Sequence, residues 1–215
     1  DIDPENYNMC PTALSIKLKN AEKLGQLPKI VMPVHFAGQS CDMIKIKKLS
    51  EKYGFKIIED ASHAIGGIYN NTKIGSCKFS DITVFSFHPV KIITTAEGGC
   101  AITNDENIFE KLKLLRSHGV TRDPKNMVKK TLDKWVYEQI SIGFNYRMSD
   151  INAALGLSQL LRIDSFIDKR KKIAKKYFQQ LKNIDLKLPK QEVYNFSALH
   201  LFPIQVKDRK KIYNL

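Results

Sequence analysis

Apolar positions over residues 29–60 follow first a strand-like and then a helix-like period. The apolar run of residues 29–35 predicts a short strand. It is followed by apolar residues at helical spacing, namely Met43, Ile46, Leu49 and Tyr53. Gly54 favours the end of that helix, and residues 55–60 are typical of a second, buried strand. Two strands joined by one helix favour parallel pairing with a right-handed crossover, which is the repeating unit of α/β proteins.

Further strands and helices are predicted in the middle of the chain. Strands are expected at residues 82–87 and 100–103, and the segment between them carries a proline and paired glycines, which indicate irregular backbone. A helix is expected from Asp105 to Leu115. Ser149 is a good N-cap for a helix with apolar positions Ile151, Ala154, Leu155 and Leu161.

Residues 117–147 are expected to form a long connection between these two helices. Connections of that length in a compact domain are more often functional than idle. The pattern as a whole predicts an α/β fold with a mostly parallel central sheet flanked by helices.

The C-terminal part reads as a separate unit. A lysine-rich amphipathic helix is predicted over residues 165–181, followed by a strand-like run at 197–206. We therefore place a domain transition near residue 165, with residues 1–165 in a large domain and 166–215 forming the start of a smaller α+β domain.

The composition is that of a globular protein. The chain has 215 residues, of which 43% are hydrophobic and 27% charged, and no apolar run reaches membrane-spanning length. Its four cysteines lie far apart without CxxC spacing, so neither a zinc site nor a disulfide framework is predicted, and a reducing cytoplasm fits best.

A net charge of +13 raises the hypothesis of nucleic-acid binding. The excess of lysine and arginine is concentrated in residues 111–134 and 160–215. In the second segment the basic residues alternate with an apolar stripe, which is typical of a solvated helix face. No helix-turn-helix, zinc-finger or aromatic RNA-binding signature accompanies the charge, so we expect no nucleic-acid partner. The positive charge would favour an anionic small substrate.

Three residues are candidates for chemistry. Asp60 follows a buried strand, where ligands bind in open parallel sheets, although such an aspartate also caps turns. His63 is equally ambiguous when taken alone. Lys91 follows an apolar strand and a proline turn, and a lysine desolvated there acts as a nucleophile.

Four segments in order resemble the DegT/DnrJ/EryC1/StrS nucleotide-sugar aminotransferases, which are fold-type I enzymes dependent on pyridoxal 5′-phosphate. The segments are residues 59–64, 85–91, 95–99 and 143–154. Residues 33–39 and 116–124, together with residues 88–91 of the second segment, are most similar to the members that act in pseudaminic acid biosynthesis.

The resemblance implies a role for each matching residue. Lys91 matches the lysine that forms the internal aldimine with pyridoxal phosphate, and Asp60 matches the acid that pairs with the pyridine nitrogen. His63 lies where the family places a glutamine or histidine beside the ring. Ser86 matches a hydroxyl near the cofactor phosphate and the substrate. Asn145 matches an asparagine given to the neighbouring subunit's cofactor and substrate site, which implies a homodimer.

The resemblance also implies a reaction. L-glutamate would load the cofactor with an amino group, which would pass to C4 of a UDP-4-keto-6-deoxy-N-acetylhexosamine. Arg122 and Lys134 in the long connection are candidate contacts for the UDP group, although each is equally typical of a solvated surface charge.

The chain begins without a methionine and its motifs begin midway through the family pattern, so we expect it to be a piece of a longer protein. The family's upstream phosphate cradle and ring-stacking aromatic residue are not in it. We therefore expect the isolated 215 residues to bind cofactor poorly.

Several alternatives stay open at the level of sequence. The protein could aminate another nucleotide-linked keto sugar, or bind pyridoxal phosphate as a regulator without turnover. A dehydratase of the same family would lack the lysine, so Lys91 argues against it. A nucleic-acid-binding module would show a strong inverse salt dependence of binding.

Overall fold

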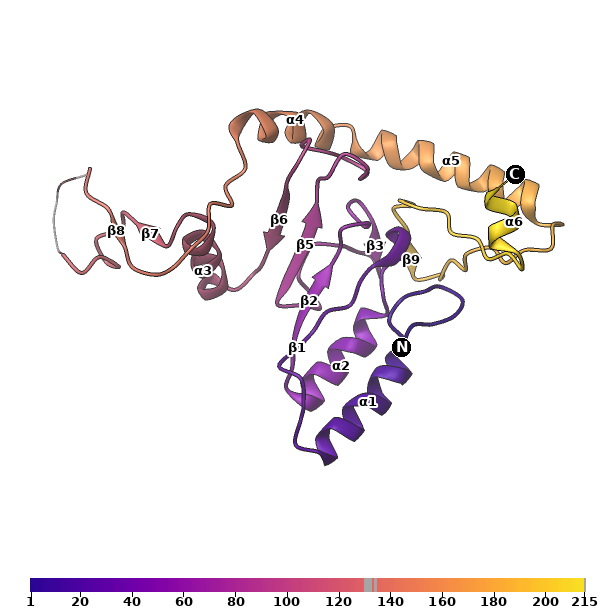
Figure 1. The fold of residues 1–215 in the computed structure, drawn as a ribbon, viewed down its shortest axis with the longest axis horizontal. Coiled ribbons are helices and arrows are strands. Elements are labelled where there is room, and N and C mark those ends of the chain that lie inside the picture. The colour runs from indigo at the N-terminus through magenta and orange to yellow at the C-terminus, as the bar shows by residue number, and fades with distance from the viewer. Residues whose placement is uncertain (130–132, 134, 215) are drawn as a thin grey trace.

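The computed structural model describes residues 1–129, 133 and 135–214. Its central sheet has the strand order β1-β2-β5-β6 (Figure 1). The bounds are Ile30–Val31 for β1, Lys56–Asp60 for β2, Ile82–Ser86 for β5 and Gly99–Ile102 for β6. The β1–β2 and β2–β5 pairs are parallel, whereas β5 and β6 are antiparallel. The predicted α/β fold with a mostly parallel sheet is confirmed.

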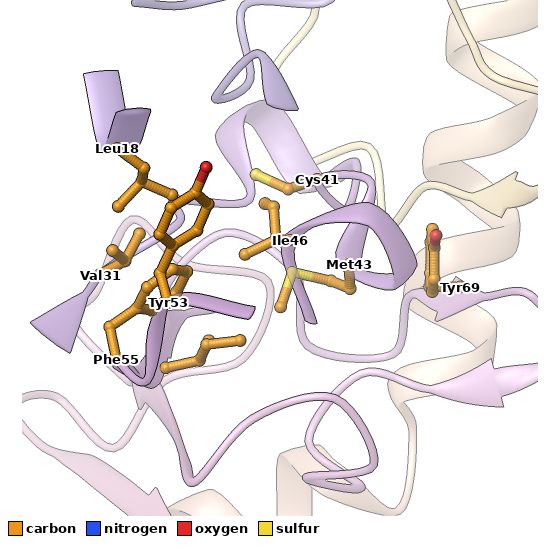
Figure 2. Packing of buried hydrophobic residues seen from close by; sticks show 9 residues of the cluster. Leu18, Val31, Cys41, Met43, Ile46, Tyr53, Phe55 and Tyr69 are labelled. Atoms are coloured by element: carbon orange, nitrogen blue, oxygen red, sulfur yellow. The ribbon is translucent and has the colours of Figure 1, made fainter. Parts of the chain in front are cut away.

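The predicted helix between β1 and β2 is α2, Met43–Tyr53. The Asp42 side chain accepts a hydrogen bond from the Lys45 amide at its start, and Gly54 ends it with a φ of 77°. A further helix, α1 (Pro11–Lys23), was not predicted and packs against α2 (Figure 1). The two helices and the first strands enclose a hydrophobic core (Figure 2), formed by Leu18, Val31, Cys41, Met43, Ile46, Tyr53, Phe55, Ile57 and Tyr69.

Three long helices follow β6 in the described part of the chain. They are α3 (Glu106–Arg116), α4 (Asp150–Leu160) and α5 (Ile163–Leu181). The Ser149 side chain accepts the capping hydrogen bond of α4, as predicted, and Asp105, the expected first residue of α3, is its N-cap. In Figure 1, α4 and α5 run one after the other past the end of the central sheet. Ile167 of α5 packs in a second core cluster with Ile92, Ile93 and Ala198.

Short elements complete the fold and were not predicted. A 3₁₀ turn, η1, spans Phe36–Gly38. A small antiparallel sheet has the order β4-β3-β9, with β3 at Ile68–Tyr69, β4 at Thr72–Lys73 and β9 at Asn195–Phe196. In the long connection, β7 (Val120–Thr121) pairs with β8 (Glu138–Gln139), and α6 covers Arg209–Tyr213.

The prediction of a strand over residues 197–206 is wrong. Leu199 has a φ of 51°, which no strand residue adopts. The backbone amides of Ala198 and Leu201 donate to the carbonyls of Gly38 and Ala37 instead of to a sheet ladder. Only an isolated bridge joins Gln205 to Lys187. Apolar side chains of this run pack on other elements: Ala198 lies in the cluster with Ile92 and Ile167, and the Phe202 ring contacts Tyr177 and Phe178 of α5.

The C-terminal segment lies against the central part of the chain. Strand β9 pairs with β3, and Gln39 exchanges hydrogen bonds with the backbone of Lys190 and Glu192. The domain transition near residue 165 stays a prediction, and α5 runs through that position without interruption.

Candidate active site

Two of the predicted site residues end neighbouring strands of the central sheet. Asp60 is the last residue of β2, and Ser86 is the last residue of β5. The strands run parallel, with Asp60 in register with Val84. Both residues therefore come from the carboxyl-terminal edge of the sheet, where ligands bind in open parallel sheets.

The carboxylate of Asp60 is half-buried and starts the turn that follows β2. Its Oδ1 atom accepts a hydrogen bond from the Ser62 amide at 3.0 Å. The turn-capping role expected for such an aspartate is therefore present. Because a carboxylate has a second acceptor oxygen, the same turn holds Asp60 at the strand end and leaves Oδ2 for another partner.

The same turn brings His63 beside this edge. Its Nδ1 atom accepts a hydrogen bond from the Ala37 amide at 3.3 Å, so a neutral His63 carries its proton on Nε2. Burial lowers the pKa of His63, the positive charge of Lys91 lowers it further, and the negative charge of Asp60 opposes both. These three predicted residues thus lie close enough for their charges to act on one another.

Lys91 lies in the loop between β5 and β6. Its amide donates to the His88 carbonyl at 2.9 Å, and the two residues after it, Ile92 and Ile93, are buried. The Lys91 side chain is half-buried, and within the described part of the chain its ammonium group has neither a hydrogen bond nor an ion pair. An amine in this setting is available for chemistry at the sheet edge.

The loop that carries Lys91 is fastened at both ends. The Thr94 amide donates to Oε1 of Gln159 on α4 at 3.0 Å, and the Asn152 amide group, also on α4, donates to the Glu97 carbonyl at 3.0 Å. At the strand end, Oγ of Ser86 accepts a hydrogen bond from the His88 amide at 3.4 Å. Helix α4 therefore fixes the loop relative to the sheet.

Asn145 does not join the other four predicted residues. It is exposed and forms an isolated bridge with Ser117 in the long connection, which Figure 1 shows extending away from the central sheet. Arg122 lies in the same connection, with its guanidinium 5.8 Å from the centre of the Tyr137 ring. Lys134, the other predicted contact for UDP, lies outside the described residues.

One residue at this site was missed by the sequence analysis. The ring of His200 lies 4.5 Å from that of His63, measured between centroids, and only 8% of His200 is exposed. It falls in the run that was interpreted as a strand. No local motif marks it, because the contact depends on how the C-terminal segment folds back onto the turn after β2.

A large groove lies elsewhere, between the sheet and the α4–α5 helices. It has a volume of about 1010 Å³ and is lined by apolar side chains that include Phe85, Ile102, Leu157 and Ile167. None of the five predicted site residues lines it.

Among the described residues there is no group of three or more histidine, cysteine, aspartate or glutamate side chains that could hold a metal ion. In the same part of the chain, no helix is long and apolar enough to cross a membrane.

Residues 1–214 match the model of the DegT/DnrJ/EryC1/StrS aminotransferase family. The chain is 42% identical over 188 residues to a UDP-4-amino-4,6-dideoxy-N-acetyl-beta-L-altrosamine transaminase from Campylobacter jejuni. That alignment covers 87% of this chain and 46% of the relative. The transaminase of the same name from Helicobacter pylori is 40% identical over 185 residues, which are 85% of this chain and 46% of the relative. The chain thus spans about half the length of these relatives.

Solved structures agree with this similarity. An aminotransferase of the same family from Brucella abortus superposes with a TM-score of 0.85 at 30% identity, over 99% of this chain and 53% of the other. Helicobacter pylori PseC, an aminotransferase involved in the biosynthesis of pseudoaminic acid, gives a TM-score of 0.82 at 34% identity, over 99% and 52%. The fold is therefore that of the fold-type I aminotransferases, as expected. The chain belongs to the DegT/DnrJ/EryC1/StrS aminotransferase family, whose cofactor is pyridoxal 5′-phosphate.

Proposed function

We propose that the protein transfers an amino group from L-glutamate to C4 of a UDP-4-keto-6-deoxy-N-acetylhexosamine, forming a UDP-4-amino-4,6-dideoxy sugar for pseudaminic acid biosynthesis. The names of the relatives from Campylobacter jejuni and Helicobacter pylori support this substrate. A spore coat polysaccharide biosynthesis protein from Bacillus subtilis is 37% identical, so the alternative is an aminotransferase for another nucleotide-linked keto sugar.

The observation that carries the proposal is the grouping of Asp60, His63 and Lys91 at one edge of the sheet. The residue types fit pyridoxal phosphate: a carboxylate for the pyridine nitrogen, an amine without a partner for covalent attachment, and the hydroxyl of Ser86 for the phosphate. When bound, this cofactor supplies an electron sink for the substrate carbon.

The protein's own residues supply charge, a tether and a proton. Asp60 keeps the ring nitrogen protonated by its negative charge. Nζ of Lys91 would hold the cofactor and would also be placed to move a proton at the substrate carbon. His63 would lie beside the ring, and because burial and the charge of Lys91 lower its pKa, its charged form, which would compete for Asp60, is disfavoured.

A second copy of the chain would complete the site. Large apolar side chains are exposed on the long connection and on α4, among them Trp135, Tyr137, Phe144, Tyr146 and Ile151. Asn145 lies between two of them, whose rings stack at 4.8 Å. Phe144 and Tyr146 form an exposed aromatic pair, and exposed aromatic side chains are enriched at protein interfaces. We expect a homodimer in which Asn145 reaches the partner's cofactor and substrate.

The test is amino transfer by the full-length protein. The purified protein is incubated with pyridoxal phosphate, L-glutamate and, separately, UDP-linked 4-keto and 3-keto sugars. Mass spectrometry follows 2-oxoglutarate and the amino sugar. Formation of both products with the 4-keto substrate is expected. Products from a different keto sugar alone would establish the alternative substrate, and cofactor binding without either product would establish a regulator.

A further inference from the structure

His200 is held in place from two directions. The Nη1 atom of Arg170, on α5, donates to the carbonyls of Leu199 and His200 at 3.2 and 3.1 Å. The amide of Ala198 donates to the Gly38 carbonyl at 2.9 Å. Together these contacts fix the segment against the loop after β1 and leave the His200 ring facing His63.

Close packing leaves little freedom at this contact. A Cβ atom on Gly38 would lie 2.7 Å from the Leu199 amide nitrogen, 3.0 Å from that of His200 and 3.1 Å from the His63 carbonyl oxygen. The three segments therefore meet backbone to backbone at Gly38. Close backbone packing at Gly38, together with the Arg170 hydrogen bonds, therefore sets the position of His200 relative to His63.

The surroundings lower the pKa of both rings and so disfavour their charged forms. Burial lowers the pKa of His200 to about 4, and the charges of His63, Lys91 and Arg170 act in the same direction. The Nδ1 atom of His200 is buried and has no hydrogen-bond partner among the described residues. A protonated ring at either position would face the positive charge of Lys91 without a carboxylate on the His200 side.

We propose that His200 is a positioning residue of this site: its ring packs against the His63 ring, excludes water from it and holds it beside the cofactor. The proposal rests on the function proposed above, in which His63 lies next to the pyridine ring. His200 acts through His63, whose ring lies 4.5 Å from that of His200 and 6.0 Å from that of Phe36, so that two neighbouring rings limit how the imidazole can turn. The C-terminal segment is thus part of the site, although His200 lies far along the chain from Lys91.

The test follows His63 without cofactor, by NMR titration of the histidine ring protons in the full-length protein. In the wild type we expect the His63 midpoint to lie below 6.5. In His200→Ala water reaches the ring, so we expect a rise of at least about half a pH unit. In His200→Phe the packing remains, and the midpoint should stay within about 0.3 units of the wild type. His118→Phe, a change at an exposed histidine on the long connection, is the matched control and should leave His63 unchanged.

Cofactor affinity provides the second readout. We expect His200→Ala to weaken pyridoxal phosphate binding roughly three- to tenfold, measured by fluorescence, and His200→Phe to restore most of it. An unchanged His63 midpoint in a folded His200→Ala protein would overturn the proposal, whether or not the cofactor binds. An altered midpoint together with no cofactor binding by the wild type would overturn the proposed function and leave the packing role standing. If His200→Phe shows the same raised His63 midpoint and the same weakened cofactor binding as His200→Ala, the His200 nitrogens and not its packing act on the site, which would overturn the proposal.

Discussion

The Nε2 atom of His35 lies 2.8 Å from a carboxylate oxygen of Glu59, and both side chains are buried. The Cys41 amide donates to the other ring nitrogen at 3.2 Å. Glu59 directly precedes Asp60, and the His35 amide donates to the Asp60 carbonyl at 3.0 Å. The buried pair therefore ties the loop after β1 to the strand end that carries the site.

Removing one partner of this pair should destabilise the fold. In Glu59→Ala the His35 Nε2 atom stays buried without an acceptor, and we expect the free energy of unfolding to fall by about 2 to 4 kcal/mol. Denaturant unfolding at pH 7 measures the loss. Glu51→Ala, a change at an exposed glutamate of α2, is the control and should alter stability by less than about 0.5 kcal/mol. Equal stability of the two variants would contradict a structural role for the pair.

The central sheet and α2 were predictable because their signals are local. Hydrophobic periodicity predicted the strands around α2, and single residues such as Gly54 and Ser149 mark helix ends through hydrogen bonds within a few residues. The position of His200 was not predictable. Its contact with His63 depends on Arg170 and Gly38, which are distant in sequence, so no local pattern records it. The positions of Asp60 and Lys91 after predicted strands made them candidates, but their roles came from the motif resemblance, since a lone lysine or aspartate does not identify a cofactor.

Replacing Asp60 by asparagine should reduce turnover and spare the fold. The asparagine side-chain oxygen still accepts the Ser62 amide, so the turn stays intact. The negative charge that keeps the pyridine nitrogen protonated is lost, and we expect kcat to fall on the order of a hundredfold or more. Thermal unfolding should shift by only a few degrees. Wild-type turnover in a folded Asp60→Asn protein would remove Asp60 from the mechanism.

Gly38 offers a test of the close contact with the C-terminal segment. An added methyl would meet the Leu199 amide nitrogen at 2.7 Å, at a φ of 104°. Gly25 also has a positive φ, of 65°, but its Cβ position has no atom within 4 Å. We expect Gly25→Ala to destabilise the protein by about 1 kcal/mol and Gly38→Ala by at least about 1 kcal/mol more. Chemical denaturation compares the two variants. Similar losses of unfolding free energy would show that the C-terminal segment moves away to accommodate the added methyl group, and would contradict a close contact at Gly38.

The lowered pKa of His200 predicts a pH dependence of stability. In the unfolded chain a histidine titrates near 6.5, whereas burial and the neighbouring charges lower the pKa of His200 to about 4. Between these values the unfolded state binds a proton that the folded state does not, so stability falls as the pH drops from 6.5 to 4. From pH 7 to 5, His200→Phe should lose about 1 to 2 kcal/mol less than the wild type. Urea unfolding at the two pH values measures this difference, and parallel losses would contradict it.

The exposed apolar surface around Asn145 predicts a weakened dimer when a charge is placed there. Ile151 on α4 is 84% exposed, and Ile151→Asp should convert a dimer to monomers in sedimentation velocity. Ile173→Asp, on the exposed side of α5, is the control. A wild-type protein that is monomeric at micromolar concentration, or an Ile151→Asp protein that remains dimeric, would contradict the proposed interface.

The central claim is that Lys91 binds pyridoxal phosphate covalently and is required for amino transfer. Absorbance of the full-length protein is recorded after addition of pyridoxal phosphate, then L-glutamate, then the UDP-4-keto sugar. Lys91→Ala is run alongside, with Lys172→Ala on the exposed side of α5 as the control. We predict that the long-wavelength cofactor band forms, disappears with glutamate and returns with the keto sugar in the wild type and in Lys172→Ala, and that Lys91→Ala shows no such cycle. A complete cycle in Lys91→Ala, or no cofactor band in the wild type, would contradict the account.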